Sequence, residues 1–239
     1  MSPDGTAGKA RESFEAPAGQ NGFFADQAHR DCPAQPLQFS FQSGHFRSSL
    51  KAIAVNRHGE PLPWYTYPAN HFLSGKRLET RRVLEFGAGQ STRWWAKNVA
   101  WVLALESNYK WFIRLRRSLP PNVCLHLIPE DLYGIEKLLP REPFDIVVID
   151  GLDRFRCAEW SLRVISPCGA IILDDSEGYW GGEEKQTYPI LELMRAQGYW
   201  RVDFFGHSPG GIRPHCTSFF FQSECFLFEG TEAPRRTIW

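Results

Sequence analysis

A short apolar run followed by a glycine-rich turn is the clearest chemical pattern in the chain. In the stretch "VLEFGAGQST", the run Val83–Phe86 predicts a buried strand, and Gly87 and Gly89 lie in the turn that follows it. Glycine lets the main chain approach a ligand because no Cβ stands in the way. In open α/β sheets, ligands bind just outside the carboxyl ends of the strands. The turn therefore indicates a ligand site, although glycine turns also occur for packing alone.

Two acids near this turn narrow the kind of ligand. Glu106 ends a second apolar run, 17 residues beyond Gly89, and an acid at that position can hold the two ribose hydroxyls of an adenosine-type ligand. A dinucleotide-binding turn would have a third glycine where this chain has Thr92. Glu85 stands just before the turn, where its carboxylate would repel a pyrophosphate and attract a cation. These residues favour a positively charged nucleoside over a dinucleotide.

A second group of acids follows two later apolar runs. Asp150 comes after "FDIVVI", and the Asp174-Asp175 pair comes after "GAIIL". Three carboxylates close together would repel one another and raise at least one pKa unless a cation or a donor intervenes. Arg154 is near enough in the sequence to be that donor, and a divalent metal is the alternative, because hard cations prefer oxygen ligands. We favour the metal-free version, in which the acids bond loop backbones or an acceptor directly.

The elements that must position these residues alternate along the chain. Short apolar, β-branched runs predict strands at 82–86, 100–106, 123–128, 144–150 and 169–175. The intervening segments predict helices over Thr92–Val99, Tyr109–Ser118, Asp131–Leu139 and Arg154–Ile165. Such alternation indicates an α/β fold with a parallel sheet and helices on both faces. The glycine turn and all the acids named above then lie at one edge of the sheet.

Two further runs close the alternating region. "WRVDFFGH" and "CTSFFFQSECFLF" follow the helix-like segment 185–198, and the linker "SPGGIRP" between them is too short for a crossover helix. An antiparallel pair at one edge of the sheet is therefore expected. Before the alternation, "PLPWYTYPANHFLSG" predicts a helical lead-in, with Pro68 at a first helical position and Gly75 at the stop.

At this point the chain resembles the class I S-adenosylmethionine-dependent methyltransferases. The resemblance rests on "LEFGAGQST", "ALE" and "FDIVVIDG", and it extends from about Arg81 to Phe228. It implies a Rossmann-like three-layer sandwich with a mostly parallel seven-stranded sheet and an antiparallel last strand. S-adenosylmethionine is the implied cofactor. Carried over by position, the cofactor residues are Glu85, Gly87, Ala88, Gly89, Ser91, Glu106, Asp131 and Asp150, with Glu130 as an alternative to Asp131 beside the base.

The resemblance also bears on the acids after the fourth and fifth strands. Catechol-type O-methyltransferases bind Mg²⁺ through an acid after the fourth strand and an Asp-Asn pair after the fifth. Here the pair is Asp174-Asp175, so an acid replaces the amide ligand. We predict that Asp150, Asp174 and Asp175 form the catalytic, acceptor side of the site without a metal. The alternative is that the same three residues bind a divalent metal.

Composition limits the partners. Lys and Arg together number 27, as do Asp and Glu, so the formal net charge is zero, whereas a nucleic-acid binder normally shows a basic excess. No stretch approaches the roughly 18 apolar residues of a membrane span. The six cysteines form no CxxC pair, which favours reduced thiols and a cytoplasmic protein. We therefore expect a small-molecule acceptor, no nucleic-acid partner and no membrane partner; the oligomeric state is not predicted.

The chain is expected to divide into four segments. Residues 1–36 predict a flexible N-terminal tail, 37–80 an aromatic-rich lead-in or cap, 81–228 the methyltransferase-like catalytic domain, and 229–239 a polar C-terminal tail. The predicted function is methyl transfer from S-adenosylmethionine to oxygen or nitrogen of a small acceptor. Two other classes stay open: a nicotinamide-dependent oxidoreductase and a non-catalytic domain that keeps the fold and binds a partner.

Overall fold

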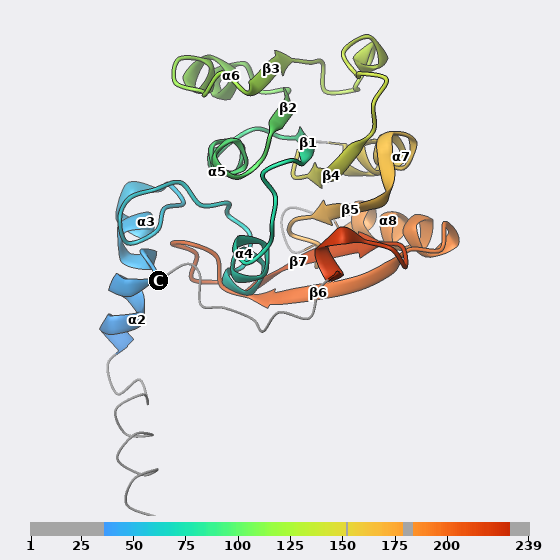
Figure 1. Cartoon of the computed structure of the whole chain (residues 1–239). Helices are drawn as coiled ribbons and strands as arrows, with labels where there is room; N and C mark the ends of the chain where they lie inside the picture. Colours follow the sequence, from blue (N-terminus) through green and yellow to red (C-terminus); the bar gives the residue numbers. More distant parts are fainter. Residues whose placement is uncertain (1–35, 152, 179–183, 230–239) are drawn as a thin grey trace, which may run out of the picture. The chain divides into compact units, whose positions relative to one another are not determined.

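A seven-stranded sheet forms the centre of the structure, a computed structural model that describes residues 36–151, 153–178 and 184–229. The strands follow the spatial order β3-β2-β1-β4-β5-β7-β6 (Figure 1). They comprise β1 Arg82–Phe86, β2 Trp101–Glu106, β3 Val123–Leu127, β4 Phe144–Ile149, β5 Ile165–Leu173, β6 Trp200–Gly206 and β7 His215–Phe221. The strand order reverses between β1 and β4, and the crevice at such a switch point is where ligands bind in open α/β sheets.

The last strand is the one that runs against the others. Strands β1 to β5 pair in parallel, whereas β7 pairs antiparallel with both β5 and β6. This arrangement confirms the predicted fold class and the antiparallel last strand. Because Leu173 at the end of β5 pairs with Ser218, the first residues of β7 lie just beyond the carboxyl end of β5.

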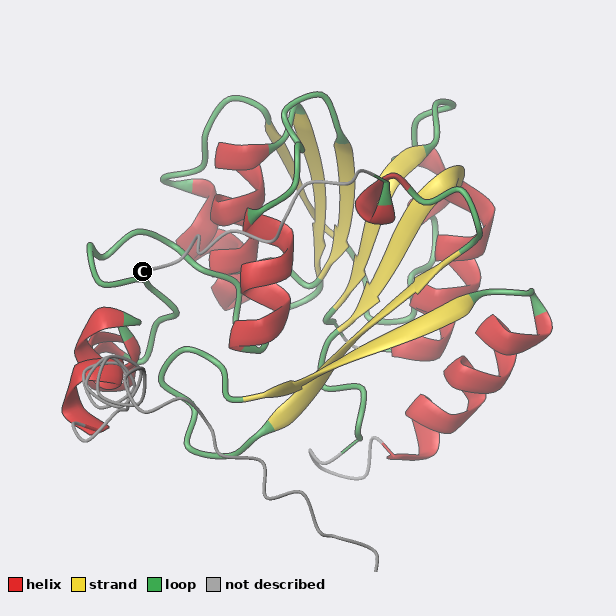
Figure 2. Ribbon diagram, turned by 60° about the horizontal axis from the view of Figure 1, so that its bottom comes forward, coloured by secondary structure: helices red, strands yellow, loops and turns green. Residues whose placement is uncertain are grey.

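Helices cover both faces of the sheet (Figure 2). The helices are α2 Pro36–Gln42, α3 His45–Lys51, α4 Tyr67–Ser74, α5 Gln90–Asn98, α6 Tyr109–Arg116, α7 Arg154–Val164 and α8 Glu184–Ala196, with short 3-10 turns η1 Ile135–Lys137 and η2 Phe226–Phe228. Side chains of α4, α5 and α6 pack in one apolar cluster, and side chains of α7 and α8 pack in another. The result is the predicted three-layer sandwich.

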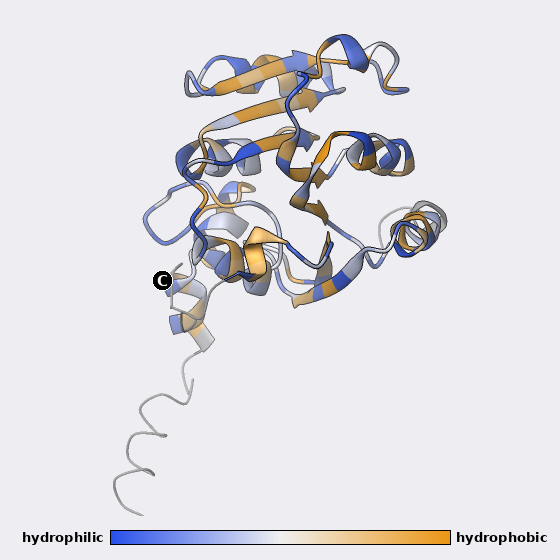
Figure 3. Ribbon diagram, turned by 45° about the vertical axis from the view of Figure 1, so that its right-hand side comes forward, coloured by the Kyte–Doolittle hydropathy of each residue, from blue (hydrophilic) through white to orange (hydrophobic). Residues whose placement is uncertain are grey.

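The strands divide their side chains between these two clusters. In β4, Ile146 and Val148 join the α5 side, whereas Val147 and Ile149 join the α7 side. Hydrophobic residues accordingly follow the strands in Figure 3. Strands buried on both faces appear in the sequence as continuous apolar runs, and for this reason the predicted strand positions agree closely with the structure.

The helices agree less closely with the predictions than the strands do. Helices α6 and α7 begin where expected, but α5 begins at Gln90 rather than Thr92. The predicted helix over Asp131–Leu139 is wrong, since only the 3-10 turn η1 forms there. Leu132 and Gly134 adopt φ values of 56° and 80°, and the left-handed backbone at these positions interrupts a right-handed helix.

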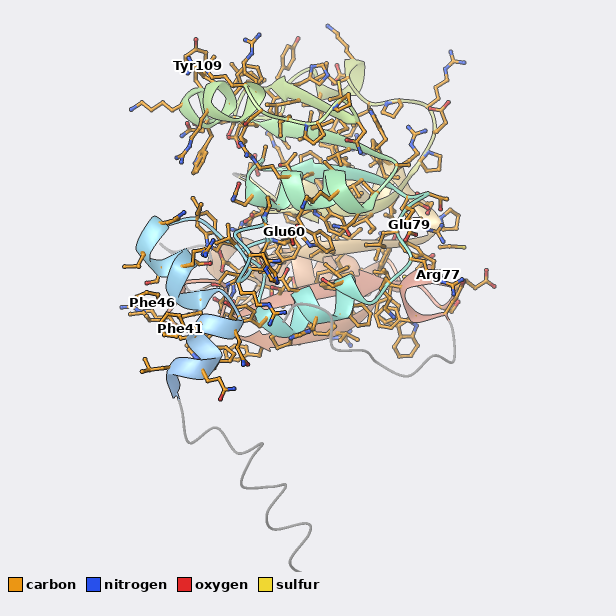
Figure 4. All side chains as sticks on the ribbon, turned by 60° about the vertical axis from the view of Figure 1, so that its left-hand side comes forward. Phe41, Phe46, Glu60, Arg77, Glu79 and Tyr109 are labelled. Atoms are coloured by element: carbon orange, nitrogen blue, oxygen red, sulfur yellow. The ribbon has the colours of Figure 1, made fainter. Side chains whose placement is uncertain are left out.

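The lead-in segment is part of the folded core. The Thr66 hydroxyl accepts a hydrogen bond from the Ala69 N–H at the start of α4, and the helix stops at Gly75 as predicted. Tyr65 and Leu73 are fully buried in the cluster on the α5 side. Farther upstream, Phe41 and Phe46 of α2 and α3 remain 56% and 44% exposed, with ring centroids 5.0 Å apart (Figure 4).

Segment boundaries are only partly described. The chain divides into compact units after Gln38, and residues 39–229 hold the sheet and both apolar clusters. The predicted tails, 1–36 and 229–239, lie outside the described residues except for Pro36, the first residue of α2, and Glu229. Among the residues that the structure describes, no helix has the length and apolar character needed to cross a membrane.

Candidate active site

Glu85 is a buried carboxylate at the end of β1. It points to the α5 side of the sheet, where the Thr92 hydroxyl donates to Oε2 at 2.5 Å. The same hydroxyl accepts the Gly89 N–H at 2.9 Å, so it joins the acid to the glycine turn. Oε1 is buried without a hydrogen-bond partner. Burial raises the pKa of Glu85 to about 7, against the hydroxyls of Ser91 and Thr92, which lower it.

Gly87 and Gly89 have different roles in the turn after β1. Gly87 has φ 90°, and a Cβ there would lie 2.7 Å from the Asp150 carbonyl oxygen. This glycine is therefore needed where the ends of β1 and β4 meet. Gly89 is extended, and its Cβ would approach only the Ser91 Oγ, at 3.8 Å. Gly89 is thus the glycine that leaves the backbone bare toward open space.

Glu106, at the end of β2, is held by main-chain donors. The Ala88 N–H donates to Oε2 at 2.9 Å, and the Asn108 N–H donates to Oε1 at 2.6 Å. The side chain is buried at 6% exposure. Each oxygen keeps a second lone pair. The turn after β1 therefore orients both acids, Glu85 through Gly89 and Glu106 through Ala88.

A shallow hollow lies at the ends of the first four strands, with Ser107, the residue after Glu106, in its wall. It is lined by Phe86, Gly87, Leu105, Ser107, Ile128, Glu130, Leu132, Gly151 and Cys157. Its walls are mainly apolar, with one acid. That acid is Glu130 rather than Asp131, whose exposed carboxylate accepts the Tyr133 N–H at 3.1 Å and so caps a local turn.

The acids after β4 and β5 meet around one guanidinium. Arg154 Nη2 lies 3.8 Å from Asp150 Oδ1 and 3.8 Å from Asp175 Oδ2. Nη1 of Arg154 donates to the main-chain oxygen of Asp174 at 2.7 Å. The arginine side chain is only 8% exposed, whereas that of Asp150 is 30% exposed. The structure therefore brings together the three predicted acids and the arginine considered as their counter-charge.

Crowding changes the acidity of this group. Burial and the neighbouring Asp175 raise the pKa of Asp174 to about 6, although the Thr217 hydroxyl, which donates to its Oδ1 at 2.7 Å, opposes the rise. Burial and Asp174 likewise raise the pKa of Asp150, and Arg154 lowers it. Two close carboxylates disfavour joint ionisation, so the group holds a proton more readily than isolated acids.

His215 belongs to the same group and was missed at the level of sequence. It is the first residue of β7, it is 7% exposed, and its Nδ1 hydrogen-bonds Asp175 Oδ1. Its Nε2 is buried without a hydrogen-bond partner. The available signal was topological, because an antiparallel last strand starts at the edge where the parallel strands end.

Tyr65 connects the lead-in segment to the site. Its buried hydroxyl accepts the Trp95 Nε1–H at 3.3 Å. Burial raises the pKa of Tyr65 well above its ordinary value, and the charges of Glu85, Asp150 and Asp174 add to that rise. The pKa of the phenol therefore depends on acids at the ends of three strands, β1, β4 and β5.

The fit of a divalent metal can be tested on these contacts. Asp174, Asp175 and His215 offer ligand atoms within 4.8 Å of one another. However, His215 Nδ1 is already bonded to Asp175, and the Arg154 guanidinium lies beside both Asp150 and Asp175. A second positive charge next to the guanidinium would be repelled. These contacts favour the metal-free version, in which the guanidinium is the cation beside Asp150 and Asp175.

Comparison with known proteins identifies the fold. No family model and no curated protein matches the sequence. Among solved structures, the O-methyltransferase TomG of Streptomyces achromogenes, in complex with SAM, is 16% identical with a TM-score of 0.53, over 82% of this chain and 94% of that one. An O-methyltransferase from Bacillus cereus, in complex with SAH, is 18% identical with a TM-score of 0.51, over 83% and 97%.

A third solved structure is a methyltransferase whose name includes precorrin-6y. Precorrin-6y C5,15-methyltransferase of Geobacter metallireducens is 17% identical with a TM-score of 0.51, over 65% of this chain and 87% of that one. At these identities the likeness concerns architecture. The chain has the fold of class I S-adenosylmethionine-dependent methyltransferases.

Proposed function

We propose that this protein transfers a methyl group from S-adenosylmethionine to oxygen or nitrogen of a small-molecule acceptor. The observation that carries the proposal is the joint placement of Glu85 and Glu106. Both are buried acids at the ends of adjacent strands, and both are tied to one glycine turn. The names of the solved structures with this fold, two of them O-methyltransferases with bound SAM or SAH, support the same class of reaction.

The residues present fit the cofactor. The unpartnered Oε1 of Glu85 offers an acceptor to a cationic ligand, in a position where burial makes an unmet hydrogen bond costly. The bare backbone at Gly89, with Ser91 beside it, suits the amino-acid part of the cofactor. Glu106 keeps a lone pair on each oxygen for the ribose hydroxyls.

The adenine would lie against the mainly apolar walls of the shallow hollow. Glu130 lines that hollow, and it is our preferred acid beside the base; Asp131, one residue on, stays the alternative. Ala88 contributes through its N–H to Glu106, and Gly87 through the close approach of β1 and β4. Asp150 stands at the border between this region and the acceptor side.

The chemistry asks mainly for positioning. Bound S-adenosylmethionine supplies a methyl group on a positively charged sulfur. The protein must hold the acceptor in line with that methyl group, and well-oriented reactants can gain roughly 7–11 kcal/mol of barrier reduction in the best cases. Asp150, Asp174 and Asp175 form the proposed acceptor side, with Arg154 as their counter-charge. We also propose a cytoplasmic location, from the cysteine pattern.

Isothermal titration calorimetry tests the proposal against the two other classes. We expect binding of S-adenosylmethionine and S-adenosylhomocysteine, and none of NAD. Binding of NAD alone would indicate an oxidoreductase, and binding of neither a partner-binding domain. Once binding is established, methyl-transfer profiling against the small-molecule fraction of a cell extract identifies the acceptor. The absence of any methylated product, with the cofactor bound, would restrict the protein to binding.

A variant at Gly89, with a control at Gly75, tests the position of the cofactor site. Gly89→Val puts a side chain into open space at the turn, whereas Gly75→Ala adds a methyl group at the end of α4, where its contacts are ordinary at 3.7 Å. We expect Gly89→Val to lose cofactor binding while its melting temperature stays close to that of the parent. Gly75→Ala should keep both properties.

A further inference from the structure

The contact between Asp175 and His215 joins two parts of the chain that the sequence separates by 40 residues. Asp175 follows β5, and His215 opens the antiparallel strand β7. The hydrogen bond uses Nδ1 of the imidazole and leaves Nε2 buried without a partner. Among the histidines of the described residues, His215 is the one that contacts the acids at the carboxyl edge.

The backbone of Asp175 is adapted to this contact. Asp175 has φ 47°, in the left-handed region, which Asp and Asn enter more readily than other residues with a side chain. The left-handed turn directs the carboxylate toward both His215 and Arg154.

The unpartnered nitrogen calls for a ligand. Leaving a buried polar atom without a hydrogen bond is unfavourable, and buried polar groups in native structures nearly always have a partner. With Nδ1–H donated to Asp175, a neutral imidazole carries its lone pair on Nε2. That atom therefore accepts a proton and does not offer one.

We propose that His215, oriented by Asp175, is the general base that takes the proton from an acceptor hydroxyl. The inference rests on the proposed methyltransferase function and narrows it to O-methylation. In the step, the O–H bond breaks and its proton moves to Nε2, while the oxygen forms a bond to the methyl carbon. The carbon–sulfur bond breaks, and its electron pair stays on sulfur. The products are the methyl ether, neutral S-adenosylhomocysteine and an imidazolium, which later releases its proton to water.

The charges around His215 support this role. Burial lowers its pKa, but Asp175, Asp174 and Glu177 raise it, and the net pKa lies above the ordinary value of 6.5. These three acids all come from the segment after β5, and Arg154 of α7 faces the other oxygen of Asp175. A base with a pKa near the working pH combines availability with driving force.

The test uses three variants of the protein. His215→Gln removes the base, and Asp175→Asn removes its orienting charge while keeping a residue that tolerates the left-handed backbone. His207→Gln is the control, since His207 is an exposed histidine after β6. Its main-chain oxygen accepts the Tyr67 N–H, and the substitution keeps that oxygen. For each we would measure cofactor affinity by calorimetry and the pH dependence of methyl transfer to the acceptor found by profiling.

We expect all variants to bind S-adenosylmethionine within about twofold of the parent. His215→Gln should lose roughly 10²- to 10⁴-fold in rate at neutral pH, together with the rise in rate with pH that the parent shows. Asp175→Asn should lose less. Full activity of His215→Gln across the pH range would overturn the proposal, as would loss of parent activity on chelation with recovery on adding Mg²⁺. Failure of the parent to bind the cofactor would instead refute the proposed function.

A ligand-free measurement tests the pair without an acceptor. In nitrogen-detected NMR of the parent, His215 should titrate above 6.5 and carry its proton on Nδ1 when neutral. Asp175→Asn should lower that pKa. A neutral His215 protonated on Nε2, or a pKa unchanged by Asp175→Asn, would contradict the proposed orientation.

Discussion

The two halves of the sheet edge hold their acids in opposite ways. At the ends of β1 and β2, Glu85 and Glu106 accept hydrogen bonds from donors supplied by one local turn and the residues next to it. At the ends of β4 and β5, Asp150 and Asp175 lie close to each other around Arg154. We call the first the backbone-held half, because main-chain N–H groups hold Glu106 directly and Glu85 through the Thr92 hydroxyl. We call the second the charge-held half, because Arg154 lies between its acids.

This difference suits the two tasks of the proposed enzyme. A cofactor of constant structure is best met by fixed main-chain donors and acceptors. An acceptor that must lose a proton needs groups whose protonation can change near neutral pH. The raised pKa values of Asp174, about 6, and of His215 belong to the second half. Glu85, in the first half, also has a raised pKa, about 7. This value describes the protein without its cofactor.

The largest effect is expected in the charge-held half. Arg154→Ala removes the guanidinium from a buried group of acids, and breaking a buried ion pair by removing one partner typically costs about 3–5 kcal/mol. We expect a loss of that order in the free energy of unfolding, measured with urea at pH 8. The control is Arg156→Ala, whose exposed side chain pairs with Asp153 at 3.5 Å. Equal stabilities of the two variants would show that Arg154 does not neutralise the acids.

The glycines of the turn separate folding from binding in the backbone-held half. Gly87→Val combines a β-branched side chain at φ 90° with overlap of the Asp150 main chain, and should cost about 2–4 kcal/mol of stability. Gly89→Val should cost little stability and abolish binding. Thermal unfolding and calorimetry measure the two effects. A Gly87→Val protein as stable as the parent would show that β1 and β4 do not approach as described.

Glu85 should make the stability of the ligand-free protein depend on pH. Its folded-state pKa, about 7, lies above the ordinary value of 4.5. The folded state therefore keeps a proton that the unfolded state releases, and this stabilising contribution is lost as pH rises from about 4.5 through 7. At 1.36 kcal/mol per pKa unit, the loss reaches at most about 3.4 kcal/mol.

The measurement for Glu85 is the free energy of unfolding of the parent and of Glu85→Gln at several pH values. The difference between the two curves isolates Glu85 from Asp150, Asp174 and His215, whose raised pKa values act in the same direction. We expect Glu85→Gln to gain stability relative to the parent as pH rises. A difference that stays constant from pH 4.5 to 8 would mean that Glu85 has an ordinary pKa.

The smallest effect concerns affinity at Glu106. Truncation to Ala would leave the N–H groups of Ala88 and Asn108 both unpaired, whereas Glu106→Gln removes the charge and keeps an acceptor oxygen for one of them. Loss of the charge from the ribose contacts should weaken cofactor binding by about 1.5 kcal/mol, roughly tenfold. Glu159→Gln is the comparison, because its exposed side chain lies on the surface of α7. Identical affinities of parent and Glu106→Gln would move the ribose elsewhere.

The strands and the glycine turn of the backbone-held half could be predicted from the sequence because their signals are local. The glycine turn lies within four residues of Glu85, and the apolar run that ends in Glu106 locates its strand. The prediction of a helix over Asp131–Leu139 was wrong because two residues there have left-handed backbone. Composition does not show which backbone conformation the surrounding structure imposes.

The charge-held half was only partly predictable for a related reason. Asp150, Asp174 and Arg154 were named from their positions after strands, but their contacts depend on three-dimensional placement. His215 joins them only because β7 enters the sheet antiparallel, so its partner Asp175 lies far away in the sequence. The division of roles between Gly87 and Gly89 likewise depends on how closely β4 approaches β1.

The most direct test of the central claim is a crystal structure with S-adenosylhomocysteine. We expect the ligand at the carboxyl ends of β1 and β2, with its ribose hydroxyls within hydrogen-bond distance of Glu106 and its adenine in the hollow beside Glu130. Its amino-acid part should pass the bare backbone at Gly89. A ligand bound elsewhere, or none at a concentration that saturates calorimetric binding, would contradict the assignment of this edge as the cofactor site.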